Sequence, residues 1–305
     1  MSRPFGIAGI QMAVVPWDAE ATAIKMDGAV RYLARSFPWL DLVLGHELAL
    51  SGLVQFSDRP GPATLRQLAT TIPGPVTDRL CETAAAVGKW LVPGSMYETD
   101  GDQIFNTAVV ISPQGEIVAR YRKMFPWLPY ETGVSAGDEF CVFDIAGAGR
   151  FGLAICYDMW FPEVPRTLAW MGADVILSPS MTPTSDREIE LTLARANAIF
   201  NQCFVVGVNG VGTWGGGRSL IVDPNGRVLQ QAGERQMLMT EVIDLAHVRL
   251  TREYGTLGLN QVWKQFRGRA AGFPVYGNAA DDGPVFASLG PVAFQDSLHR
   301  TTSDS

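Results

Sequence analysis

The stretch Phe151-Gly-Leu-Ala-Ile-Cys-Tyr-Asp-Met-Trp-Phe-Pro-Glu163 changes from an apolar run to a proline-marked segment at a single cysteine, Cys156. Its first five residues are typical of a buried strand, and Pro162 suits the first turn of a helix expected over 162–171. A thiol at such a strand-to-helix turn lies at the sheet edge, where the following N–H groups point toward charge developing on a carbonyl oxygen. The stretch therefore predicts a nucleophile, although an isolated Cys is more often an inert buried thiol.

Two other segments end on groups that can act with a thiol. The short apolar run Asp41-Leu-Val-Leu-Gly-His-Glu47 ends on a carboxylate, and the strand-like stretch that includes Tyr121-Arg-Lys123 ends on an amine. Alone, each of these charges is explained as well by a solvated strand end. Open α/β sheets, however, gather their reactive groups at the carboxyl ends of strands. We therefore expect Glu47, Lys123 and Cys156 to converge in one site.

The composition limits what kind of protein this is. A chain of 305 residues with 47% apolar residues can bury a large core and is expected to form one main domain. The net charge of −7 disfavours binding to nucleic acid or to an anionic membrane. The N-terminal stretch lacks the features of a signal peptide, and no run of about eighteen apolar residues occurs, so we expect a cytoplasmic protein without membrane contact.

The cysteines and histidines argue against a metal centre. The 4 cysteines lie far apart without paired metal-ligand spacing, and we expect them to be reduced thiols. The 3 histidines of the chain are too few for a histidine-based site. We therefore expect no metal and no cofactor, and a small neutral molecule as the partner.

The apolar pattern alternates between strand-like and helical segments, which indicates an α/β fold. The expected strands cover 5–12, 40–44, 90–97, 105–111, 117–122, 151–155, 175–178 and 203–208, and the expected helices cover 19–36, 75–87, 162–171 and 185–201. Ser112-Pro-Gln-Gly115 and Asp223-Pro-Asn-Gly226 each predict a hairpin turn, so part of the sheet structure is antiparallel. After Leu245 the periodicity fades, and we interpret 268–305 as a C-terminal extension of a domain that covers 1–267.

The order of Glu47, Lys123 and Cys156 along the chain resembles that of the nitrilase superfamily of carbon-nitrogen hydrolases, and the similarity extends from Ile7 to about Asp244. The resemblance implies a four-layer α-β-β-α sandwich with mixed sheets. It also implies a homo-oligomer, because family members use C-terminal extensions to contact a neighbouring subunit. A loosely held terminus remains the alternative for this tail.

The resemblance also implies roles for the site residues. Cys156 attacks the carbonyl carbon, Glu47 is the general base and then the general acid, and Lys123 and the N–H of Tyr157 stabilise the oxyanion. Glu131 corresponds to a second pocket glutamate of many members, which either holds Lys123 or positions the amide nitrogen. Ammonia then leaves and a thioester forms, which water hydrolyses.

The substrate class is inferred from the segments around the lysine and the cysteine. The run from Tyr121 to Glu131, with its Pro-Trp pair, resembles the aliphatic amidase and formamidase branch, so we expect a small primary amide as the substrate. Family members that hydrolyse nitriles usually carry a Glu-Asn pair shortly after the cysteine, which this chain lacks. An N-carbamoyl amide hydrolase is the nearest alternative, and a nitrilase or a non-catalytic binding or assembly module is the second.

Several further residues have two interpretations. Trp127, Trp160 and Met181, together with Tyr130, either line the pocket and favour an acyl group larger than formyl or are ordinary core residues. His46 stands where the family commonly has proline, and it is either a partner of Glu47 or a core histidine. Two helix arginines, Arg187 and Arg195, could bind a substrate carboxylate, but solvated helix charges are the more common case. We interpret Gly215-Gly-Gly217 as a flexible turn, because it lacks the residues of a phosphate loop.

Overall fold

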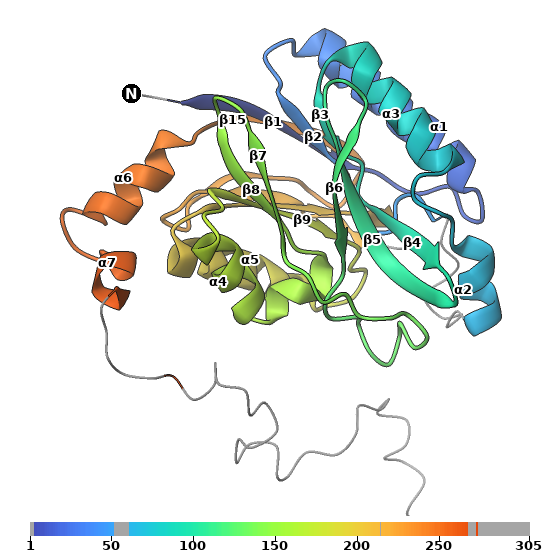
Figure 1. The fold of residues 1–305 in the computed structure, drawn as a ribbon. Coiled ribbons are helices and arrows are strands. Elements are labelled where there is room, and N and C mark those ends of the chain that lie inside the picture. Colours follow the sequence, from blue (N-terminus) through green and yellow to red (C-terminus); the bar gives the residue numbers. More distant parts are fainter. Residues whose placement is uncertain (1–2, 52–60, 214, 268–272, 274–305) are drawn as a thin grey trace, which may run out of the picture.

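Two β-sheets lie face to face between two layers of helices. This computed structural model describes residues 3–51, 61–213, 215–267 and 273. The outer face of one sheet is covered by α1 (Ala19–Ser36) and α3 (Pro75–Val87), and that of the other by α4 (Glu163–Trp170) and α5 (Arg187–Asn201), as Figure 1 shows. The expected four-layer sandwich is therefore confirmed.

The first sheet combines parallel and antiparallel strands from the first half of the chain with one strand from its end. Its order is β15 (Met237–Asp244), β1 (Pro4–Gln11), β2 (Leu42–Leu44), β3 (Trp90–Val92), β5 (Gln103–Ile111) and β4 (Ser95–Asp100), and β6 (Ile117–Arg122) also pairs with β5. The pairs β1–β2 and β2–β3 are parallel, whereas β15 runs antiparallel to β1. Because β15 closes this sheet beside β1, residues far apart in the sequence share one core.

The second sheet comes from the second half of the chain. Its order is β14 (Val228–Gln231), β13 (Leu220–Val222), β10 (Phe204–Asn209), β9 (Val175–Ser180), β8 (Gly149–Leu153) and β7 (Cys141–Ile145). The central strands β8, β9 and β10 are parallel, and the outer pairs are antiparallel. Two parallel neighbouring strands must be joined by a crossover, which is usually a helix. Accordingly, α4 lies between β8 and β9 in the sequence, and α5 lies between β9 and β10.

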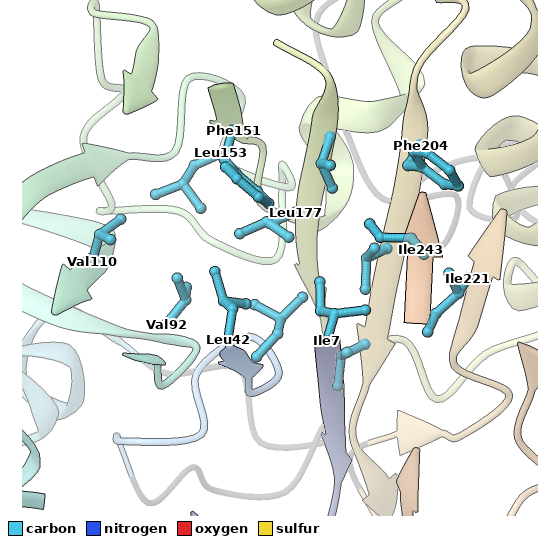
Figure 2. Packing of buried hydrophobic residues seen from close by; sticks show 14 of the residues in the cluster. Ile7, Leu42, Val92, Val110, Phe151, Leu153, Leu177, Phe204, Ile221 and Ile243 are labelled. Carbon is cyan, nitrogen blue, oxygen red and sulfur yellow. The ribbon is translucent and has the colours of Figure 1, made fainter. Parts of the chain in front are cut away.

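The layered packing follows from the alternation of side chains along the strands. In β1, Ile7 faces the second sheet, whereas Ile10 packs under α1 and α3. In β9, Leu177 faces the first sheet, whereas Ile176 packs under α4 and α5. Figure 2 shows side chains of both sheets meeting in the central layer, where Leu42 and Leu177 belong to one cluster. Strands with two apolar faces are what a sheet buried on both sides requires.

One predicted strand was wrong in detail. The run expected as one strand over 90–97 is split into β3 and β4 by Pro93-Gly94. Gly94 has a φ of 99°, and a Cβ at this position would lie 1.9 Å from the carbonyl oxygen of His46. This close approach of two loops requires glycine, so the chain bends where the apolar pattern alone suggests continuity.

Several elements were missed. These are β7, β15, α2 (Pro62–Leu68), α6 (Ala246–Tyr254) and α7 (Val262–Phe266), while β13 and β14 were expected only as the runs joined by the hairpin turn Asp223-Pro-Asn-Gly226. The buried positions of α6 are Ala246, Val248 and Thr251, a small and partly polar set that gives little apolar periodicity. Gly215-Gly216 forms strand β12, paired with β11 (Val211–Gly212), so this segment is not merely a flexible turn. Apart from Phe273, the expected extension 268–305 lies outside the described residues.

His46 is a core residue. Its ring is fully buried, and Nδ1 lies 2.8 Å from the carbonyl oxygen of Glu47, so Nδ1 carries the proton that it donates. A side chain at Gly210 would approach this ring within 3.1 Å, so the loop after β10 packs directly against it. Burial lowers the pKa of His46 to about 4. The structure therefore supports the second interpretation of His46, a neutral histidine that bonds the backbone.

Replacing Leu177 by alanine should lower the free energy of unfolding by about 2–5 kcal/mol, because it opens a cavity between the two sheets. Leu177 is 0% exposed, whereas Leu250 on α6 is 45% exposed and provides the matched control. Leu250→Ala should change stability by less than about 1 kcal/mol. Urea unfolding followed by circular dichroism would measure both, and equal losses would contradict the packing described above.

The lowered pKa of His46 predicts a specific acid sensitivity. In the unfolded chain His46 binds a proton as the pH falls below 6.5, whereas in the folded protein it does so only near pH 4. The free energy of unfolding is therefore highest above pH 6.5 and decreases as the pH drops toward 4. The loss from this residue amounts to about 3 kcal/mol at most. In urea unfolding between pH 7 and pH 4.5, the stability difference between the native protein and His46→Gln should therefore shrink. A difference that stays constant with pH would refute this assignment.

Candidate active site

Glu47, Lys123 and Cys156 meet in one pocket between the ends of strands from both sheets. Glu47 follows β2, Lys123 comes directly after β6, and Cys156 follows β8. The pocket has an empty volume of about 500 Å³. Its lining includes the residues that the sequence placed in the site, namely Glu47, Lys123, Trp127, Tyr130, Glu131, Cys156, Tyr157, Trp160 and Met181. The convergence expected from strand ends is therefore present, and the catalytic roles of these residues are addressed below as proposals.

Cys156 begins a single 3-10 turn, Cys156–Trp160, which precedes α4. Its φ of 47° lies in the left-handed region, which non-glycine residues adopt only when the surrounding structure enforces it. Asp158 supplies that enforcement, since its carboxylate accepts hydrogen bonds from the N–H of Ile155 at 2.8 Å, the N–H of Phe125 at 2.9 Å and the hydroxyl of Tyr121 at 2.7 Å. The strained turn that presents the thiol is thus held by a fully buried carboxylate.

Lys123 is buried between two carboxylates. Its Nζ donates to Glu47 Oε1 at 2.8 Å and to Glu131 Oε2 at 2.7 Å, and its side chain is only 1% exposed. Asn106 on β5 joins the same two glutamates, because its Nδ2 donates to Glu47 at 2.9 Å and to Glu131 at 3.0 Å. Glu131 also accepts from the N–H of Trp127 at 2.6 Å. Of the two arrangements considered for Glu131, the structure shows the one in which it holds Lys123.

Burial and the neighbouring charges shift the pKa values of Glu47, Lys123 and Cys156. Burial raises the pKa of Glu47, and Glu131 adds to the shift while Lys123 opposes it. Burial alone would lower the pKa of Lys123, but the carboxylates of Glu131 and Glu47 raise it well above its ordinary value. Burial, Glu47 and Glu190 together raise the pKa of the Cys156 thiol, with Lys123 acting in the opposite sense. A protonated thiol therefore lies beside a carboxylate whose basicity is increased, which suits a general base.

Aromatic side chains form much of the remaining wall. The ring centroids of Trp127 and Tyr130 are 5.4 Å apart, and those of Tyr157 and Trp160 are 5.8 Å apart. All four residues line the pocket, together with Met181. Such a wall suits an apolar group attached to the atom that the thiol attacks.

Sequence reasoning missed four pocket residues, Leu48, Thr182, Asp186 and Glu190. It was also wrong about Arg187. Glu190 lies on α5, and its Oε1 accepts from the hydroxyl of Thr182 at 2.7 Å. Arg187 is not a solvated helix charge, because it is 5% exposed and its guanidinium lies 2.9 Å from Glu190. Only its i, i+3 spacing to Glu190 could have indicated this pair, and such spacing is equally common on solvated helix faces. Arg195 does lie on the exposed side of α5, where its Nε donates to the carbonyl of Gly226.

Comparison with known proteins agrees with this architecture. The family model of carbon-nitrogen hydrolases matches residues 6–253. The formamidase of Bacillus cereus (strain B4264) is 33% identical over 174 residues, which are 57% of this chain and 51% of that protein. A formamidase of Bacillus anthracis (strain A0248) gives the same figures. The chain thus spans about half the length of the curated relatives that it matches.

Two solved structures share the fold. Nit3 of Saccharomyces cerevisiae, a member of branch 10 of the nitrilase superfamily, has a TM-score of 0.75 and 25% identity, covering 84% of this chain and 95% of that one. A mutant of the amidase from Nesterenkonia sp. AN1 has a TM-score of 0.69 and 24% identity, covering 83% of this chain and 95% of that one. Other structures of that amidase contain acrylamide or butyramide. The family model, which covers most of the chain, shows that this protein belongs to the carbon-nitrogen hydrolase family.

Proposed function

We propose that this protein is a cysteine-dependent amidohydrolase that converts a small primary amide to a carboxylic acid and ammonia through a thioester. The observation that carries the proposal is the meeting of a strained cysteine with a buried Glu47–Lys123 pair in one pocket. Formamidase relatives and the amidase from Nesterenkonia sp. AN1 support this reaction class.

The proposed reaction has two halves. Glu47 takes the thiol proton, Cys156 Sγ bonds to the carbonyl carbon, and the negative charge moves to the carbonyl oxygen, where Lys123 and the N–H of Tyr157 stabilise it. Glu47 then returns the proton to the nitrogen, the carbon–nitrogen bond breaks, ammonia leaves, and the acyl group stays on Cys156 as a thioester. In the second half Glu47 takes a proton from water and the hydroxide attacks the thioester carbon. The carbon–sulfur bond then breaks, Glu47 returns the proton to Sγ, and the carboxylic acid is released.

The lining of the pocket argues for a substrate without a carboxylate. Of the described residues that line the pocket, only Lys123 is positively charged, while Glu47, Glu131, Asp186 and Glu190 are acidic. Arg187 does not supply a free cation, since its guanidinium binds Glu190 and the carbonyls of Gly217 and Arg218. An N-carbamoyl amino acid hydrolase needs such a cation, so the amidase is the better supported function.

The aromatic wall of the pocket favours an acyl group larger than formyl. We expect short aliphatic or aromatic amides to be better substrates than formamide, because they bury more apolar surface against Trp127 and Trp160.

The homo-oligomer and the cytoplasmic location expected from the sequence stay predictions, which light scattering and cell fractionation would test. Among the described residues, no helix has the length and apolarity needed to cross a bilayer.

The reaction class can be tested by measuring ammonia release from primary amides, N-carbamoyl amino acids and nitriles. The native protein should hydrolyse a primary amide, and Cys156→Ser should lose this activity by several orders of magnitude because it lacks the nucleophile. Cys203→Ser is a control, since Cys203 is buried under α5, outside the pocket. Turnover confined to carbamoyl compounds or nitriles would move the protein to another branch, and no turnover would favour a binding or assembly role.

The role of Lys123 can be separated from that of the thiol. Lys123→Met removes an oxyanion donor and should lower kcat by at least about a hundredfold, while the shape of the pocket is largely kept. Lys89→Met is the matched control, because Lys89 bonds only the backbone carbonyl of Pro38 far from the pocket. The melting temperature of each variant must also be measured, to show that a lower kcat does not come from unfolding. Unfolding is a concern because the loss of Lys123 leaves two buried carboxylates without their cation. A folded Lys123→Met protein with full kcat would exclude the proposed role.

A further inference from the structure

The Cys156 thiol has a second set of partners that the amidase mechanism does not use. Its Sγ lies 3.7 Å from Thr182 Oγ1 and 3.8 Å from Glu190 Oε1, both within hydrogen-bonding distance for sulfur. Thr182 follows β9, and Glu190 lies on α5. The nucleophile is thus contacted by a carboxylate other than its proposed base.

Glu190 is held in place by buried contacts. Its two carboxylate oxygens are divided between partners, since Oε1 accepts from Thr182 at 2.7 Å and Oε2 pairs with Arg187 at 2.9 Å. The side chains of Arg187 and Glu190 are only 6% and 10% exposed. Arg187 is itself fixed by the carbonyls of Gly217 and Arg218, at 3.1 and 2.8 Å. A buried ion pair with its remaining donors satisfied gives one defined geometry.

Thr182 is fixed equally well. Its N–H donates to Asn209 Oδ1 at 2.8 Å, and its carbonyl accepts from Asn209 Nδ2 at 3.1 Å. The same Nδ2 also donates to the carbonyl of Gly217 at 2.9 Å, which is the carbonyl that Arg187 binds. Thr182, Glu190 and Arg187 therefore form one connected network that ends at the sulfur, and we call it the α5 network.

The α5 network also closes a small cavity behind the cysteine. This cavity is lined by Cys156, Ser178, Ser180, Arg187 and Glu190 together with apolar residues, and it is distinct from the substrate pocket that contains Glu47 and Lys123. The thiol lies on the border of the two, because Cys156 and Glu190 line both. A sulfur with space on two sides needs a partner that selects one side-chain rotamer.

We propose that Glu190 is a positioning residue for Cys156, which with Thr182 fixes the thiol in the rotamer that faces the substrate carbonyl. Arg187 balances the charge of Glu190. The paired carboxylate can therefore accept a hydrogen bond from the thiol, and it repels the thiolate less than an unpaired carboxylate would. The inference rests on the proposed amidase function, because it assumes that Cys156 is the nucleophile. The charged groups that face the thiol are Glu47, Lys123 and Glu190, and removing Glu190 takes away one negative charge.

The test compares Glu190→Gln with Glu188→Gln in the full chain. Glu188 lies on the same helix, but its side chain is 68% exposed, so Glu188→Gln should behave like the native protein. Glu190→Gln should lower kcat about ten- to hundredfold with little change in KM, because a misplaced nucleophile loses reactivity rather than substrate binding. We would also measure the rate of Cys156 alkylation by iodoacetamide as a function of pH. In Glu190→Gln this rate should begin to rise at a lower pH than in the native protein, because a negative charge that repels the thiolate has been removed.

A second pair of variants covers the case in which Glu190→Gln does not fold. Thr182→Val removes the hydroxyl with little change in shape and should lower kcat, whereas Thr182→Ser keeps the hydroxyl and should restore it. The proposal is overturned if Glu190→Gln matches Glu188→Gln in both kcat and alkylation, or if Thr182→Val retains native kcat. Alkylation requires no turnover of an amide. If the proposed function fails and no amide is hydrolysed, the alkylation profile of Glu190→Gln still shows whether Glu190 acts on the thiol.

Discussion

The buried ammonium of Lys123 is the constraint on which the rest of this site depends. Removing an isolated charge from water costs several kcal/mol even after relaxation, so a folded chain must place opposite charges against it. Here Glu47 and Glu131 lie within 2.8 Å of the ammonium, and Asn106 holds both carboxylates in place. Since these residues come from separate segments of the first sheet and its loops, that sheet must form before the site can exist.

The second sheet contributes the thiol that we propose as the nucleophile, and the meeting of the two sheets brings it to the buried carboxylates and the ammonium. Cys156 stands at the end of β8 in a left-handed conformation that Asp158 stabilises through three hydrogen bonds. The hydroxyl of Tyr121, on β6 of the first sheet, is one of the three donors, so the strained turn is fixed across the interface between the sheets. The large apolar layer in that interface keeps the base and the thiol at a constant separation.

Charge is distributed unevenly around the pocket, and this bears on specificity. The wall combines aromatic side chains with carboxylates, and the arginine that sequence reasoning considered as a carboxylate binder is occupied inside the α5 network. An arginine that satisfies its donors within the protein cannot bind a substrate carboxylate without leaving Glu190 buried and unpaired. A neutral amide is therefore the substrate with which the described pocket is electrostatically consistent.

The residue pattern by itself predicted the alternation of strands and helices and the residues that meet in the pocket, whereas the four layers were implied only by the family resemblance. Continuous apolar runs indicate strands with two buried faces, and a carboxylate, an amine and a thiol at strand ends indicate a common site, since strand ends of a sheet converge. Only the tertiary structure decided the break at Gly94, the weakly periodic helix α6, and the pairing of Arg187 with Glu190 beside the thiol. These features depend on which backbone or side chain approaches from another element, and local periodicity carries no information about that approach.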